Sequence, residues 1–283
     1  MNVIEVKGLK KSYGDVHAVQ SLDLTIAQGE IFALLGPNGA GKTTTVEILE
    51  GFRKRDSGEV SVLGFDPQTS GHQAREWRNR IGIVLQSAAD AGDLSVIETV
   101  QHFSGYYSNP RDVDEVITSV GLQEKAGALI RNLSGGQRRR LDVALGIIGS
   151  PELLFLDEPT TGFDPEARRA FWALIENLRG TGTTILLTTH YLDEAEALAD
   201  RVAVINNGRI VEISTPEDLG GRATAKALVS WRDGDETKTQ TTDNPTSLVS
   251  KLSTQFSGEI PELTVTRPSL EDIYLTMIGG THE

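Results

Sequence analysis

The stretch from residue 36 to residue 44 has the residue types and spacing of a loop that binds phosphate. Its three glycines let backbone N–H groups converge on an anion without obstruction by a Cβ atom. Lys42 can reach the β- and γ-phosphates of a nucleotide, and the hydroxyl of Thr43 suits Mg²⁺. The full set of candidate ligands is Gly36, Pro37, Asn38, Gly39, Ala40, Gly41, Lys42, Thr43 and Thr44. The alternative, a glycine-rich turn that binds nothing, is disfavoured by a Lys-Thr pair after glycines at these offsets.

The segments on either side of this loop predict how it is held. Residues 31–35 form a continuous apolar run that predicts a buried strand, and residues 43–49 have helical character. A strand, a glycine-rich loop and a helix in this order give the phosphate a helix N-terminus with free N–H donors.

Two adjacent carboxylates follow a second apolar run. Residues 153–156 predict a strand buried on both faces, and Asp157 and Glu158 stand at its end. Carboxylates are expensive to bury without cations, so we expect Asp157 to hold Mg²⁺. Glu158 is then placed to polarise water against a γ-phosphate. A solvent-facing acidic turn is the alternative.

Polar residues follow two further predicted strands. Gln86 follows residues 81–85, and His190 follows residues 183–189. Ligands of parallel α/β sheets lie at the carboxyl ends of the strands, so Gln86 can touch a metal or water. His190 can donate to a phosphate oxygen or hold Glu158 in place. Taken alone, each is an ordinary polar residue after a strand.

Residues 133–141 begin another predicted helix. Ser134 with Gln137 three residues later is a capping box, which marks a helix start. Two interpretations remain open: a well-capped helix only, or a second anion site formed by Ser134, Gly135, Gly136 and the helix N-terminus. The arginines that follow, at residues 138–140, are expected on a solvated helix face.

Tyr13 is the candidate for contact with a nucleotide base. Its aromatic face can stack on a base, because stacking tolerates any π-face. The alternative is a tyrosine that packs over a turn. The phosphate-binding pattern further along the chain favours stacking.

Composition excludes several other classes. The 283 residues carry a net charge of −13, which argues against a general nucleic-acid surface. The chain has no cysteine, which excludes disulfides and thiolate metal sites. No apolar run approaches the ~18 residues of a membrane span, and no signal peptide is visible, so we expect a soluble, cytoplasmic protein.

The pattern predicts an α/β fold with three parts. Residues 1–86 and 151–220 form a P-loop ATPase core with a largely parallel sheet and N-terminal antiparallel strands. Residues 87–150 form a helical subdomain, because apolar residues recur there at helical spacing. Residues 221–283 form a small α+β appendage with no catalytic constellation.

Together, these motifs resemble the ATP-binding subunits of ATP-binding cassette (ABC) transporters. The resemblance covers residues 2 to about 220. It rests on the loop 36–44, Gln86, the run Leu-Ser-Gly-Gly-Gln at 133–137, the strand ending in Asp157 and Glu158, the loop 161–164 and His190. The run at 133–137 is the most specific, because other P-loop ATPases lack it.

The resemblance implies a mechanism in which two subunits stack head to tail as a homodimer. ATP lies between residues 36–44 of one subunit and Ser134, Gly135, Gly136 and Gln137 of the other. Lys42, Thr43, Gln86 and Asp157 hold phosphates and Mg²⁺. Tyr13 stacks on adenine, Glu158 is the general base, His190 senses phosphate, and Asp164 contacts the partner.

The resemblance also implies a separate membrane permease, met by residues 87–95, which places the chain on the inner face of the cell membrane. The tail 267–274 resembles the ends of drug and antibiotic exporter subunits, so export of drugs, antibiotics or other hydrophobic compounds is expected. The alternatives are an importer subunit, a soluble ABC-type ATPase acting on ribosomes or DNA, and a binding module without turnover. One departure is Phe163, where many relatives have leucine.

Overall fold

The computed structural model describes residues 1–84, 92–256 and 259–279. The chain divides into two compact units, Met1–Ile213 and Ser214–Glu283. Gln86, and part of the 87–95 segment expected to meet a permease, fall outside the described residues.

A six-stranded sheet forms the centre of the first unit, in the order β5-β6-β7-β3-β8-β9. Its strands from β5 to β8 pair in parallel. The six strands of the sheet are β3 (Ile31–Leu35), β5 (Ile81–Val84), β6 (Leu153–Asp157), β7 (Thr184–Thr189), β8 (Arg201–Asn206) and β9 (Arg209–Ser214). Strands β3 and β7 are buried throughout, and β6 is buried up to Leu156, which explains their unbroken apolar sequences. This confirms the predicted parallel core.

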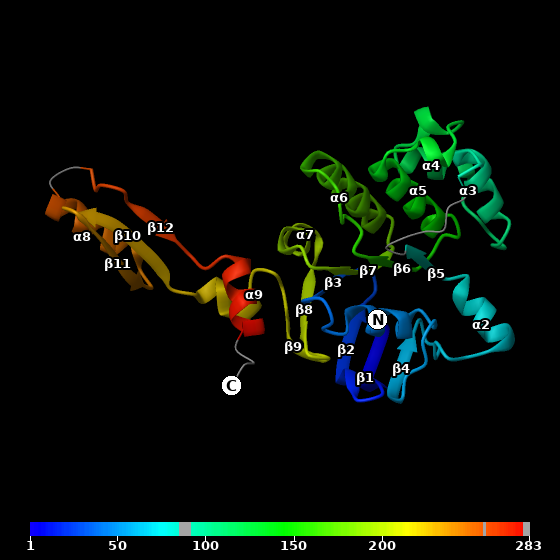
Figure 1. Cartoon of the computed structure of the whole chain (residues 1–283), viewed down its shortest axis with the longest axis horizontal. Helices are drawn as coiled ribbons and strands as arrows, with labels where there is room; N and C mark the ends of the chain where they lie inside the picture. Colours follow the sequence, from blue (N-terminus) through cyan, green and yellow to red (C-terminus); the bar gives the residue numbers. More distant parts are fainter. Residues whose placement is uncertain (85–91, 257–258, 280–283) are drawn as a thin grey trace. The chain divides into compact units, whose positions relative to one another are not determined.

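A second, antiparallel sheet of order β2-β1-β4 covers one face of the parallel sheet (Figure 1). It consists of β1 (Asn2–Tyr13), β2 (Val16–Ala27) and β4 (Ser57–Val62). β1 and β2 have 12 residues each and extend well beyond the short apolar segments 3–6 and 22–26, which are the parts of the sequence that indicate strands. Register shifts interrupt their alternation of apolar and polar residues, which hid their full length in the sequence. Apolar side chains of this sheet and of the parallel sheet form one core, to which helix α1 (Lys42–Leu49) also contributes.

Helices α6 (Pro165–Gly180) and α7 (Leu192–Leu198) lie on the opposite face of the parallel sheet (Figure 1). Asp164 caps α6 through a 2.8 Å hydrogen bond from the Ala167 N–H, and Pro165 occupies the first turn. Helix α2 (Gly71–Arg78) packs near β5 through the fully buried Trp77.

Residues 95–147 are mainly helical, as expected. Helices α3 (Val96–Ser104), α4 (Val113–Ser119) and α5 (Gly135–Ile147) pack on one another, with short 3₁₀ turns at Gln123–Lys125 and Ile130–Asn132. Helix α5 also packs on β5, which joins this subdomain to the sheet.

The second unit has its own small core. Strands β10 (Ala227–Asp233), β11 (Glu236–Thr242) and β12 (Thr264–Thr266) form a sheet of order β11-β10-β12. Helix α8 (Pro245–Phe256) packs on it through Leu252, against Val229 and Trp231. Helix α9 (Leu270–Gly279) packs on the 3₁₀ segment Leu219–Thr224. Among the described helices of both units, none is both long and apolar enough to cross a membrane.

Candidate functional site

The loop 36–44 leaves the buried strand β3 and enters α1 at Gly41. Gly41 has a φ of +105°, and a Cβ there would lie 2.3 Å from the Ala18 carbonyl oxygen. A Cβ on Gly36 would lie 2.3 Å from the Ile205 carbonyl oxygen. Only glycine therefore fits both positions, and the backbone N–H groups at the start of α1 stay accessible to an anion.

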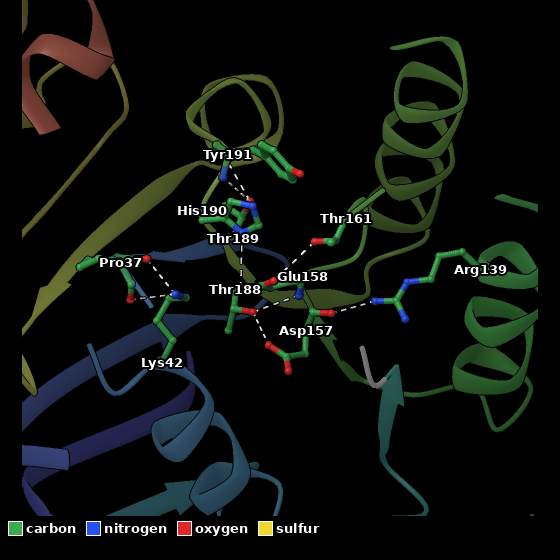
Figure 2. Close-up of polar contacts among 11 residues, drawn as sticks. Pro37, Lys42, Arg139, Asp157, Glu158, Thr161, Thr188, Thr189, His190 and Tyr191 are labelled. Atoms are coloured by element: carbon green, nitrogen blue, oxygen red, sulfur yellow. Dashed lines mark hydrogen bonds and ion pairs between the residues drawn. The ribbon is translucent and has the colours of Figure 1, made fainter. Parts of the chain in front are cut away.

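Lys42 is buried at the first position of α1. Its Nζ donates hydrogen bonds to the carbonyl oxygens of Gly36 at 2.7 Å and Pro37 at 3.2 Å (Figure 2). Burial lowers the pKa of Lys42, while the nearby Glu158 and Asp157 oppose this effect. The ammonium group thus lies over its own loop and is held by two neutral carbonyl oxygens. A phosphate oxygen can take the place of these acceptors, because its hydrogen bond with the ammonium group is charge-assisted and stronger.

Asp157 and Glu158 are oriented by Thr188 of the neighbouring strand. The Thr188 hydroxyl donates to Asp157 Oδ1 at 2.5 Å and accepts from the Glu158 N–H at 3.0 Å. Glu158 has a φ of +44°, an unfavourable conformation for a residue with a Cβ. The Thr188 carbonyl also accepts from the Glu158 N–H at 3.2 Å, which helps to stabilise this turn. Local backbone strain of this kind occurs often at functional sites.

His190 and Thr161 are among the groups that contact the Glu158 carboxylate. His190 Nδ1 lies 3.4 Å from Oε1, and the Thr161 hydroxyl donates weakly to Oε2 at 3.4 Å (Figure 2). Glu158 also borders a hollow of about 140 Å³ with Lys42, Thr43 and other residues of the loop 36–44. The sheet thus brings together Lys42, Asp157, Glu158 and His190, which lie in three separate segments of the sequence.

The helix start at Ser134 has the predicted capping box. The Ser134 side chain accepts from the Gln137 N–H, and the Gln137 side chain accepts from the Ser134 N–H at 3.0 Å. Ser134, Gly135 and Gly136 line a cavity of about 570 Å³ together with Glu158 and Asp164. Glu158 therefore borders both this cavity and the hollow at the loop 36–44.

The expectation for Arg139 was wrong. The structure buries its side chain instead of placing it on a solvated helix face, and burial lowers its pKa. Its guanidinium donates to the carbonyl oxygens of Asp157 at 2.8 Å and Pro159 at 3.0 Å. Arg139 thereby ties α5 to the strand end that carries the two acids. Neither Arg139 nor Thr188 stands out in the sequence, because their roles depend on contacts between distant segments.

The remaining candidates are placed less centrally. Tyr13 ends β1 with a partly exposed ring, and the cationic groups of Lys11 and Arg53 lie 5.4 and 5.3 Å from its centroid. The ring of Phe163 packs edge-on against Phe171, with centroids 5.9 Å apart. Asp164 is exposed on the wall of the larger cavity.

Comparison with known proteins agrees with this geometry. The family model described as ABC transporter matches residues 19–161. The Nod factor export ATP-binding protein I of Rhizobium sp. (strain N33) is 37% identical, over 99% of this chain and 98% of that protein. The daunorubicin/doxorubicin resistance ATP-binding protein DrrA of Streptomyces peucetius is 35% identical, over 98% of this chain and 92% of that protein.

Solved structures show the same fold. The chain is 28% identical to cbiO1 from Clostridium perfringens, part of the ABC transporter complex cbiONQ, with a TM-score of 0.70 over 77% of this chain and 90% of that one. The cassette MJ0796, whose post-hydrolysis state bound to ADP and Pi is dimeric, has a TM-score of 0.67 at 23% identity, over 75% of this chain and 98% of that one. From the sequence matches and the assembled site we conclude that this chain belongs to the ABC transporter family and is an ATP-binding, ATP-hydrolysing subunit.

Proposed function

We propose that this subunit binds ATP between two copies of itself, in a head-to-tail homodimer. The residues 36–44 of one copy hold the phosphates, and Ser134, Gly135, Gly136 and Gln137 of the other cover them. The observation that carries the proposal is the convergence of Lys42, Asp157, Glu158 and His190 at the ends of β3, β6 and β7, which are neighbours in the sheet. Each copy has both halves of the site, so two working sites can form.

In this scheme, Glu158 accepts a proton from the attacking water. Its carboxylate lies beside His190, which donates a hydrogen bond to the γ-phosphate and keeps the carboxylate in position. Lys42 exchanges its loop carbonyls for phosphate oxygens and stabilises the charge of the leaving group. Tyr13 stacks on adenine, and Asp164 contacts the partner copy.

Mg²⁺ fits the donor groups at this site. At nucleotide sites, Mg²⁺ is usually bound through one or two carboxylates together with phosphate oxygens and waters. Thr43, the second residue of α1, has an exposed side chain, and Asp157 offers a carboxylate at the strand end. These residues, with Gln86, would hold the ion, which neutralises phosphate charge when it is bound.

We further propose that the subunit drives export through a separate permease at the inner face of the cell membrane. The named functions of the relatives, Nod factor export and daunorubicin resistance, favour drugs, antibiotics or other hydrophobic compounds as cargo. An importer subunit is the alternative. The proposed domains are the ATPase core at 1–86 with 151–220, the permease-facing helices at 87–150 and a small appendage at 221–283.

A hollow of about 390 Å³, lined mainly by apolar residues but also by Glu50 and Arg78, is a candidate seat for a permease helix. Phe52, Ile83, Phe103, Tyr107 and Leu145 contribute to its lining, at the end of α1 and beside β5, α3 and α5. Phe52 is 67% exposed, which is unusual for phenylalanine. An apolar face of a cytoplasmic permease helix would bury this ring, so Phe52→Asp should abolish capture of the permease from membranes while ATP binding is retained.

Cross-linking tests the head-to-tail arrangement directly. The chain has no cysteine, so single cysteines can be placed at will. A mixture of Asn38→Cys and Ser134→Cys, both in a Glu158→Gln background, should form a disulfide-linked dimer only when ATP is present. Each variant by itself should give no such product. Failure of the mixture to cross-link in ATP would reject the arrangement.

A further inference from the structure

A cluster of buried polar side chains lies near the end of β7, which His190 follows. The mechanism above does not use this cluster. Glu194 of α7 is fully buried, and neither of its carboxylate oxygens has a hydrogen-bond partner in the part of the chain that the structure describes. Thr160 Oγ1, Arg168 Nε and Trp172 Nε1 are also buried without a partner in the same part of the chain. Such groups are costly, and few occur in a native protein.

These groups surround one another. Burial raises the pKa of Glu194, and the nearby side chains of Thr189, Thr160 and Trp172 and the charge of Arg168 oppose that increase. The donors therefore lie close enough to interact with the carboxylate, and the geometry of these contacts falls short of that of full hydrogen bonds. A small movement of either side would complete several hydrogen bonds at once.

Each donor belongs to a segment that matters for catalysis. Thr160 begins the loop that ends at Asp164, which lines the cavity in front of Ser134. Thr189 directly precedes His190. Arg168 and Trp172 lie on α6, the helix that Asp164 caps. Glu194 thus lies at the junction between the loop that faces the partner and the histidine that contacts Glu158.

A second set of contacts connects the same segments. The guanidinium of Arg168 lies 4.5 Å from the centroid of the Tyr191 ring, and that ring lies 4.1 Å from the imidazole of His190. The Tyr191 N–H donates to the Thr189 hydroxyl at 2.9 Å, which orients this hydroxyl (Figure 2). A shift of α6 is therefore transmitted to His190 by packing as well as by the polar cluster.

We propose that Glu194 is a positioning residue that sets His190 against Glu158 when the second copy docks on the 160–164 loop. This inference depends on the proposed head-to-tail dimer. Docking moves the loop and α6 by a small distance, and the hydroxyls of Thr160 and Thr189 then donate to Glu194. The completed hydrogen bonds hold His190 in its working position, so hydrolysis is coupled to closure. In the open protomer, the buried polar groups that have no hydrogen-bond partner among the described residues are unfavourable, and the movement relieves this cost.

The variant Glu194→Gln tests the proposal, because it keeps the shape of the side chain and removes its charge. We expect kcat to fall about tenfold or more, as small misplacements of catalytic groups cost that much. The affinity of the isolated protomer for ATP should be unchanged. The midpoint of thermal unfolding should be equal or higher, because a neutral amide is cheaper to bury than a carboxylate. The matched control is Glu196→Gln, an exposed residue on the same helix, which should behave as wild type.

A double-mutant cycle with His190→Ala separates positioning from a general structural role. If Glu194 acts through His190, the double variant should be no slower than His190→Ala alone, so the two effects are not additive. Additive losses, an unchanged kcat in Glu194→Gln, or a fall in kcat that parallels a lower unfolding midpoint would overturn the proposal. ATP-dependent dimerisation of Glu158→Gln is measured alongside, and its absence would instead reject the dimer on which the inference depends.

Discussion

The two parts of the candidate site are built in different ways. The catalytic half, consisting of Lys42, Asp157, Glu158 and His190, depends on contacts between residues far apart in the chain, such as Thr188 with Asp157 and Glu158. The signature half, residues 134–137, is a helix start whose capping bonds join residues three apart. The first half needs the whole sheet, and the second needs one turn of helix. Substitutions should therefore damage the two halves differently.

Glu158→Gln should have the largest effect on turnover. Loss of a general base costs about 10²- to 10⁴-fold in rate. The amide keeps the size of the side chain, so ATP should still bind and the ATP-dependent dimer should persist. Phosphate release and size-exclusion chromatography with ATP measure the two effects. Hydrolysis at the wild-type rate would remove Glu158 from this role.

Lys42→Ala should weaken the binding of ATP itself. A charged hydrogen bond is worth about 1.5–3 kcal/mol, so the Kd for ATP should rise about tenfold to a hundredfold. The folded protein should not lose stability in proportion, because burial already disfavours the Lys42 charge and lowers its pKa. Fluorescent-nucleotide titration measures the affinity, with exposed Lys54→Ala as control. An unchanged affinity would contradict the proposed role of the loop.

Ser134 offers a way to separate capping from nucleotide contact. Ser134→Ala should cost about 1 kcal/mol of stability through loss of the cap. Ser134→Asp keeps a capping side chain, so the stability should be retained. Its negative charge would face the γ-phosphate, however, so the ATP-dependent dimer of Glu158→Gln should be lost. If Ser134→Asp dimerises normally with ATP, the signature half is only a helix start.

Substitution of Asp142 should have the smallest effect, a change in how the free energy of unfolding depends on pH. Burial raises the pKa of Asp142 to about 6 from an ordinary 3.8, although Arg139 and Arg138 oppose this. The folded state therefore binds more protons than the unfolded state between these values. This contribution is fully present below pH 3.8 and is lost as pH rises through about 6, by at most ~1.4 kcal/mol per pH unit. Asp142→Asn should flatten that slope in urea unfolding, and parallel profiles for the two proteins would contradict the prediction.

Much of the fold follows from local sequence patterns. The apolar runs 31–35 and 153–156 predict buried strands, and the strands form β3 and β6 at nearly these bounds. β8 and β9 are joined through Asn207 and Gly208, both with positive φ, and Asn-Gly is a residue pair typical of tight hairpin turns. Arg139 shows the limit. Its neighbours in sequence are charged, and only the position of β6 against α5 makes it a buried donor to the Asp157 carbonyl.

By itself, the sequence determined which chemistry this protein carries: the phosphate-binding loop, the paired acids and the capped signature helix, because each depends on residues close together in the chain. Only the tertiary structure decided that Thr188 orients both acids, that Arg139 joins the signature helix to them, and that Glu194 lies among unpaired donors. These contacts join segments brought together by the order of strands in the sheet and by helix packing, and spacing along the chain does not encode either.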